Sequence, residues 1–213
     1  MSIAHDVDFL IVGQGLAGSM LAWHLIHDGQ RVLVVDDDAP GAASRVAAGL
    51  VNPLAGMRFN RRPELTNWLA SAQSWYHDVT SICGKPVLHR LPMLRLLRSE
   101  EQSRFHARRR EDPLSAPLLG PLLQPDEIPE PVTATHGAFV QQRTGYVALP
   151  RLLQKIRRWL EAQGAFEVAK IKLEELEPTA DAIRWRAVSA RHAVLCHGAQ
   201  LADDPWFGYL PLA

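Results

Sequence analysis

Three glycines near the amino terminus are spaced in a way that suits the binding of a dinucleotide. Gly13, Gly15 and Gly18 directly follow the apolar run at residues 8–12. At this spacing the first glycine permits a tight turn, the second lets the backbone approach a pyrophosphate, and the third lets the next helix pack closely on the strand. The free N–H groups at the start of that helix would then meet the phosphates. The motif therefore predicts a phosphate-binding turn.

An acidic residue lies where such a turn needs a partner. Asp36 follows a second apolar run, at residues 31–35, and lies at about the twenty-residue spacing from the glycines that the motif requires. Its carboxylate would accept hydrogen bonds from the hydroxyl groups of an adenosine ribose, and it would repel the additional phosphate of NADP. These residues predict a dinucleotide site and leave NAD and FAD as alternatives.

The hydrophobic pattern predicts the elements that position these residues. The runs at 8–12 and 31–35 are typical of strands buried on both faces of a parallel sheet, and the residues between them predict a helix that Gly29 ends. Residues 39–56 are expected to form a loop with a helical turn. Further helices are expected over 64–79, 99–111 and 150–164, and strands within 86–97 and over 137–142, 166–173, 183–187 and 192–196. The stretch 113–131, rich in proline and leucine, is expected to be a long surface connection. This order indicates an α/β fold with a Rossmann-like βαβ unit.

Other segments of the chain resemble the D-amino-acid oxidase/glycine oxidase (DAO) family of FAD-dependent oxidoreductases. Residues 44–50 (SRVAAGL) resemble that family's loop on the flavin side, and residues 193–199 (AVLCHGA) resemble its second signature, a strand that ends in a glycine turn near FAD. Residues 143–147, followed by a predicted helix, lie where the family returns to its FAD-binding domain. His197 departs from the pattern, because the family usually has Thr or Ser there. The resemblance covers most of the chain and favours FAD over NAD.

The resemblance implies specific roles in holding FAD. Backbone at Leu16 and Ala17 would contact the pyrophosphate, and Asp36, helped by Asp37, would bind the ribose. Ala43, Ser44 and Arg45 would lie by the phosphates, and Ala48, Gly49 and Leu50 would lie beside the isoalloxazine ring. Ile171 would offer its backbone to the adenine, and Gly198 belongs to the second glycine turn. No catalytic side chain is assigned, because in this family the protein mostly positions the substrate and tunes the flavin.

The resemblance also implies an activity, namely oxidation of the C–N bond of an amino acid or related amine by hydride transfer to flavin N5. Family members are much longer, and their later part supplies a substrate-binding arginine and the last loop that contacts flavin. We therefore expect an amino-terminal portion that does not turn over an amine by itself. Two alternatives are the FAD domain of an oxidoreductase that modifies a tRNA wobble base and a noncatalytic nucleotide-binding fragment.

A change of pattern in the middle of the chain predicts an inserted region. An alternating strand, a charged helix and a proline-rich stretch suit an antiparallel sheet with one wet face, whereas the flanking parts carry buried strands of the parallel type. We expect the first part of the FAD-binding domain at 1–83, part of an inserted α+β substrate domain at 84–142, and the continued FAD-binding domain at 143–213.

Composition limits the partners and the location. The 213 residues include 23 Lys+Arg and 23 Asp+Glu, and this balance argues against bulk nucleic-acid binding. No apolar run approaches the length of about 20 residues that a membrane-spanning helix needs. Cys83 and Cys196 indicate neither a disulfide framework nor a zinc site, and His24 and His27 lack a third ligand, so no metal is expected and a cytoplasmic location is favoured. Exposed strand edges in such a portion would favour association as a homo-oligomer.

Overall fold

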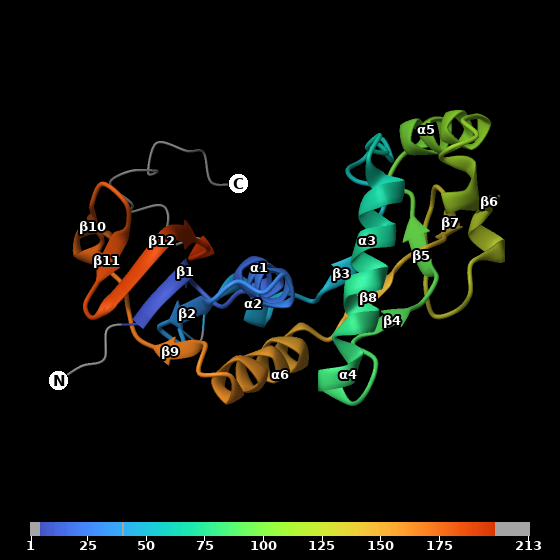
Figure 1. Cartoon of the computed structure of the whole chain (residues 1–213). Helices are drawn as coiled ribbons and strands as arrows, with labels where there is room; N and C mark the ends of the chain where they lie inside the picture. Colours follow the sequence, from blue (N-terminus) through green and yellow to red (C-terminus); the bar gives the residue numbers. More distant parts are fainter. Residues whose placement is uncertain (1–4, 40, 199–213) are drawn as a thin grey trace. The chain divides into compact units, whose positions relative to one another are not determined.

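The computed structural model describes residues 5–39 and 41–198, and the chain divides into two compact units (Figure 1). Unit 1 comprises residues 1–47 and 149–213, and unit 2 comprises residues 48–148. The domain boundaries expected at 83/84 and 142/143 both fall inside unit 2. Within the described residues no helix is long and apolar enough to span a membrane.

Unit 1 is built around a six-stranded sheet of order β10-β11-β12-β1-β2-β9. Strands β12, β1, β2 and β9 are parallel neighbours, and β10 and β11 add an antiparallel edge. The strands are β1 (His5–Val12), β2 (Val32–Asp36), β9 (Phe166–Val168), β10 (Glu177–Pro178), β11 (Ile183–Trp185) and β12 (Val188–Leu195). The helices are α1 (Leu16–His27), α2 (Ala43–Val46) and α6 (Leu149–Ala162), with a 3-10 turn at Leu173–Glu175. This arrangement confirms the predicted α/β fold with a parallel sheet.

Apolar stripes in the sequence explain how unit 1 packs. Four consecutive residues of β2 are buried, as expected for a strand covered on both faces. The buried side of α6 consists of leucines and one isoleucine at helical spacing, at positions 149, 152, 153, 156 and 160. Trp23 of α1 and Trp159 of α6 lie with ring centroids 4.8 Å apart, so these two helices pack against each other. Their contact places α6 beside the turn that precedes α1.

Unit 2 contains two three-stranded antiparallel sheets, of order β3-β8-β4 and β5-β7-β6. Its strands are β3 (Leu50–Val51), β4 (Leu88–Arg90), β5 (Met93–Leu96), β6 (Leu119–Leu123), β7 (Ala138–Gln141) and β8 (Gly145–Val147). Its helices are α3 (Leu65–Asp78), α4 (Thr80–Cys83) and α5 (Glu100–Glu111), with 3-10 turns at Ala116–Leu118 and Pro125–Glu127. The predicted antiparallel character of the middle region is confirmed, because 86–97 lies outside the parallel sheet.

Two expectations about single elements were wrong, and the strand expected within 86–97 is present but divided. The stretch 113–131 contains β6, which pairs with β7 and buries Leu119; an edge strand with a shifted register tolerates Pro121, and this masks the strand period. Residues 86–97 form two strands in different sheets, separated at Pro92, which lacks an N–H group to continue the ladder. The strand expected over 166–173 ends at Val168.

Candidate functional site

The turn between β1 and α1 has the geometry that its glycines predict. Gly13 has φ +101°, a conformation that L side chains rarely adopt, and its N–H donates to the carbonyl of Val35 at 2.7 Å. A Cβ on Gly18 would collide with the carbonyl oxygen of Gly13, because the start of α1 packs directly on the end of β1. The turn therefore depends on glycine at both positions.

The hydroxyl group of Ser44 lies at the start of α1. The backbone N–H of Leu16 donates to Ser44 Oγ at 3.1 Å, and a Cβ on Gly15 would lie 3.2 Å from the same oxygen. Ser44 belongs to the short helix α2, which thereby lies against the amino-terminal end of α1. A hydroxyl in this place shows that an oxygen ligand can accept from the helix N-terminus.

Asp36, at the end of β2, is fixed to the glycine turn by its carboxylate. Its Oδ2 accepts the backbone N–H of Gln14 at 2.6 Å, and its Oδ1 accepts the N–H of Asp38 at 2.9 Å. The side chain of Asp36 is 14% exposed, so one edge remains open to solvent. The carboxylate thus lies beside the glycine turn.

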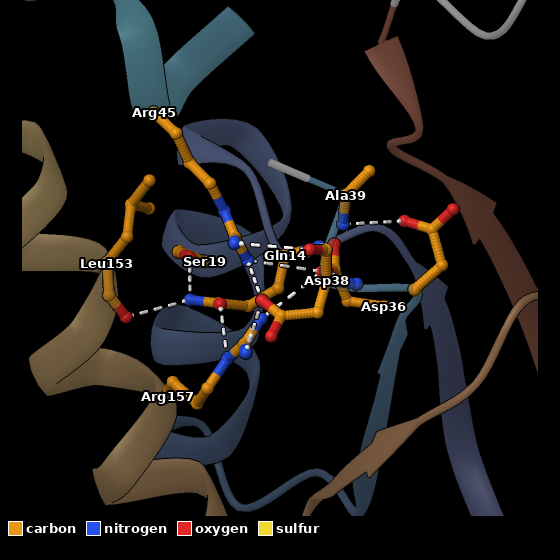
Figure 2. A network of polar contacts seen from close by, with 9 residues as sticks. Gln14, Ser19, Asp36, Asp38, Ala39, Arg45, Leu153 and Arg157 are labelled. Atoms are coloured by element: carbon orange, nitrogen blue, oxygen red, sulfur yellow. Dashed lines mark hydrogen bonds and ion pairs between the residues drawn. The ribbon is translucent and has the colours of Figure 1, made fainter. Parts of the chain in front are cut away.

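Two arginines hold the carboxylates at the end of β2, and Figure 2 shows them approaching from opposite sides. Arg157 of α6 contacts Asp38 Oδ1 at 2.7 Å and Asp36 Oδ1 at 3.2 Å. Arg45 of α2 contacts the same oxygens at 2.5 and 3.5 Å. Hydrogen bonds from Arg45 and Arg157 hold the pKa of Asp38 below its ordinary value. The cluster carries two negative and two positive charges.

Gln14 connects this cluster to α6 (Figure 2). Its buried side chain donates to Ser19 Oγ and to the carbonyl of Leu153, each at 3.0 Å, and accepts from Arg157 Nε at 3.2 Å. Sequence reasoning missed Gln14, Asp38 and Arg157. Gln14 occupies the variable position of the glycine motif, and Arg157 is separated from Asp36 by 121 residues, so no local pattern marks either one.

A cavity of about 190 Å³ opens beside this cluster within unit 1. Of the residues predicted to hold a cofactor, eight line it, namely Gly13, Gly15, Asp36, Asp37, Ala43, Ser44, Ile171 and Gly198. Residues that were not predicted also line it, including Ala169, Lys170, Cys196 and His197. Burial raises the pKa of the Cys196 thiol, so this wall of the cavity is not an anionic one. Segments 13–15, 36–44, 169–171 and 196–198 are thus brought together.

The remaining predicted residues lie in two places. Leu16, Ala17, Gly18 and Arg45 belong to α1 and α2, next to the residues that line the cavity. Ala48, Gly49 and Leu50 belong to unit 2. There Gly49 has φ +68°, its carbonyl accepts the N–H of Val147 at 2.9 Å, and Leu50 opens β3 with an exposed side chain. Small residues at 47–50 therefore lead into a strand.

The chemistry of unit 1 fits a dinucleotide. A pyrophosphate needs N–H donors at a helix start, and the start of α1 presents the N–H of Leu16 next to Gly15, with the Ser44 hydroxyl accepting from it. A ribose needs an acceptor for its hydroxyl groups, and Asp36 supplies one at the edge of the cavity. Lys170 and Ile171 also line the cavity. These parts together make a cradle for an adenosine with its phosphates.

Comparisons with known proteins agree with this geometry. A family model described as FAD-dependent oxidoreductase (DAO) matches residues 8–210. Glycine oxidase from Geobacillus kaustophilus superimposes with a TM-score of 0.73 at 18% identity, over 98% of this chain and 60% of that one. Iminodiacetate oxidase from Chelativorans sp. BNC1 gives a TM-score of 0.72 at 20% identity, over 92% and 56%. The uncharacterized oxidoreductase YurR from Bacillus subtilis is 43% identical over 53 residues, which is 25% of this chain and 14% of YurR. The chain thus spans less than two thirds of the length of each of these proteins.

Proposed function

Because the chain belongs to the DAO family of FAD-dependent oxidoreductases, whose cofactor is FAD, we propose that it contributes the cofactor-binding part of an enzyme that oxidises the C–N bond of an amino acid or related amine. The observation that carries this proposal is the cavity in unit 1, which joins the glycine turn to Asp36. A dinucleotide cradle of this kind, in a chain of this family, supports FAD as its ligand.

Each part of the cradle has a proposed task toward FAD. Backbone N–H groups at Leu16 and Ala17 donate to the pyrophosphate, with Ser44 and Arg45 beside it and Ala43 leaving space. Asp36, with Asp37 next to it, accepts from the ribose hydroxyl groups. The backbone of Ile171 lies beside the adenine, and Gly198, which follows β12, lines the cavity. Gly13, Gly15 and Gly18 keep the turn compact.

Unit 2 provides the proposed flavin side. Ala48, Gly49 and Leu50 would lie beside the isoalloxazine ring, where small residues admit a flat ring and backbone N–H groups can reach its polar edge. Bound FAD supplies an acceptor for the hydride that leaves the carbon of the substrate's C–N bond. The residues of the chain bind and orient the cofactor, and no side chain here is assigned to proton transfer. Residues 84–142, which lie within unit 2, are proposed to form part of the substrate side.

An amine is the proposed substrate class because the structural relatives are named for oxidising glycine and iminodiacetate. Both compounds carry a C–N bond next to a carboxylate. Balanced charge and two distant cysteines support the cytoplasm as the place of action.

Flavin absorbance tests the proposal directly. The purified chain is mixed with FAD, freed of excess ligand by gel filtration, and examined for visible flavin absorbance. We expect retained colour in the wild type and none in soluble Gly15→Val, because the new side chain enters the space of the pyrophosphate. Gly29→Asn is the matched control, since nothing lies within 4 Å of a Cβ at Gly29 and asparagine tolerates its positive φ. A coloured Gly15→Val protein would show that the cofactor lies elsewhere.

Anaerobic mixing with amines tests the activity. The FAD-loaded chain is mixed with D- and L-amino acids and N-methylated amines, and bleaching of the flavin is followed. We expect that none of these compounds rapidly bleaches the flavin bound to the 213-residue chain. Rapid stoichiometric bleaching of the flavin by one of these compounds would refute the expectation that the present chain is catalytically incomplete.

A further inference from the structure

We propose that Arg157 of α6 is a positioning residue for the adenosine ribose, and that it acts by holding the carboxylate of Asp36 in the orientation that selects a ribose over a deoxyribose. The inference rests on the proposed binding of FAD in unit 1. It adds a residue from a distant helix to a site otherwise built from the β1–α1 turn, the end of β2 and α2.

The guanidinium group of Arg157 has one defined orientation (Figure 2). Its three nitrogens each have a separate acceptor: Nε donates to Gln14 Oε1 at 3.2 Å, Nη1 to Asp38 Oδ1 at 2.7 Å and Nη2 to Asp36 Oδ1 at 3.2 Å. The group also lies over the ring of Phe166, with its central carbon 4.7 Å from the ring centroid. Only 16% of the side chain is exposed. A planar guanidinium group that donates from all three nitrogens and stacks on an aromatic ring cannot rotate without losing several of these contacts.

This orientation determines how Asp36 presents its oxygens. The Gln14 N–H fixes Oδ2 at 2.6 Å, and Oδ1 accepts from the Asp38 N–H at 2.9 Å and from Arg157 at 3.2 Å, so the carboxylate plane is held from both ends. A carboxylate oxygen accepts about two hydrogen bonds, so Oδ2, which accepts the N–H of Gln14, retains capacity for a ribose hydroxyl. Arg45 also reaches Asp36 Oδ1, but at 3.5 Å and from a side chain that is 27% exposed. Arg157 is therefore the stronger constraint of the two.

The negative charges around the site also require a nearby cation, and Arg157 supplies one. Asp36 and Asp38 place two negative charges near the start of α1, where a pyrophosphate would add more. Like charges at this range repel each other, and an opposite charge in contact with both carboxylates offsets the repulsion. Arg157 touches both carboxylates, and the pKa of Asp38 is held down by this contact and that of Arg45. Removal of Arg157 would loosen the carboxylate of Asp36, which would keep the N–H groups of Gln14 and Asp38, and would leave the acidic pair with Arg45 alone of the two arginines.

A purely structural role predicts a different result from a positioning role. Arg157 also ties α6 to the glycine turn through Gln14, and loss of that tie alone would weaken every ligand of unit 1 equally. Loss of carboxylate orientation would instead remove the preference for the ribose hydroxyl. The ratio of the dissociation constants of 2′-deoxy-ADP and ADP separates these roles, because the two ligands differ only in the 2′-hydroxyl.

The experiment measures ADP and 2′-deoxy-ADP as competitors of FAD on the wild-type chain, Arg157→Met, Arg157→Lys and Arg158→Met. Arg158 is the matched control, because it is exposed on the same helix and forms no ion pair among the described residues. We expect wild type and Arg158→Met to bind ADP about tenfold more tightly than 2′-deoxy-ADP, which corresponds to one charge-assisted hydrogen bond. In Arg157→Met the ratio should fall to less than twofold, and in Arg157→Lys it should be intermediate, since lysine cannot reach both carboxylates as a fork.

Each outcome has a distinct meaning. A wild-type chain that binds neither FAD nor ADP refutes the proposed function itself. If the wild type binds both and Arg157→Met keeps the tenfold ratio, even with weaker affinities, Arg157 is only structural and this inference is overturned. If Arg157→Met does not fold, Arg157→Lys tests the inference instead. A tenfold ratio of the two dissociation constants in Arg157→Lys would equally overturn it. A wild type that binds ADP and 2′-deoxy-ADP alike overturns the ribose assignment of Asp36 and the inference with it.

Discussion

Replacement of Gln14 by leucine tests whether one buried side chain joins the glycine turn to α6. Gln14 is 2% exposed and makes three side-chain hydrogen bonds, to Ser19, Leu153 and Arg157. Leucine has a similar volume and offers no polar atom, so Gln14→Leu removes all three bonds without creating a large cavity.

The cost of this change follows from the bonds that are lost. A neutral buried hydrogen bond contributes about 1 kcal/mol and one to a charged group about 1.5–3 kcal/mol, so two of the first kind and one of the second give about 3–5 kcal/mol. The carbonyl of Leu153 also loses its side-chain donor from Gln14. Since about 1.4 kcal/mol corresponds to a factor of ten, the opening equilibrium around α1 and α6 should shift by at least a hundredfold.

Native-state hydrogen exchange, read by mass spectrometry, measures this shift by region. Peptides from α1 and α6 should exchange at least a hundredfold faster in Gln14→Leu, and peptides from α3 and α5 in unit 2 serve as the internal reference. Gln163→Leu is the matched control, because Gln163 is an exposed residue near the end of α6 with one hydrogen bond, to the carbonyl of Trp159 at 3.3 Å, and its loss should change little. An acceleration below tenfold in Gln14→Leu would refute the idea that this side chain holds the turn to α6.

Three further predictions concern single residues. Gly18→Ala should give a protein that retains no FAD on gel filtration, because the new methyl group meets the carbonyl oxygen of Gly13. Burial lowers the pKa of His106 below its ordinary 6.5, so the folded state binds fewer protons there than the unfolded state; stability measured by urea unfolding should fall as the pH drops below about 6.5, and His106→Gln should reduce this dependence. Ser99→Ala should destabilise α5 by about 1 kcal/mol in the same assay, because the Ser99 hydroxyl accepts the N–H of Gln102 at the start of that helix.

The prediction of elements from sequence succeeded where the determining residues are close together. The β1–α1–β2 unit, the burial of α6 along its apolar stripe and the start of α5 after Ser99 all depend on residues within one or two turns or strand lengths. Local periodicity and capping express the burial of one face and the satisfaction of terminal N–H groups, so the sequence carries them directly.

Prediction failed where pairing with a distant segment decides the structure. Strand β6 contains a proline and has no clear alternation, yet it forms because β7 offers it a partner. The break at Pro92 divides one apparent strand between two sheets for the same reason. A strand of a few residues has little preference of its own, and its partner supplies the hydrogen bonds that stabilise it.

The candidate site shows the same division between local and distant information. The glycines and Asp36 could be named from the sequence, because the spacing of a turn, a helix and a strand brings them to one edge of the sheet. Arg157 and its contacts with Gln14, Asp36 and Asp38 could not, because they arise only when α6 packs beside the β1–α1 turn. The sequence alone therefore predicted the groups that are proposed to touch a dinucleotide, whereas the tertiary structure alone decided which charges lie against them, since electrostatic contacts depend on distance in space and not on separation along the chain.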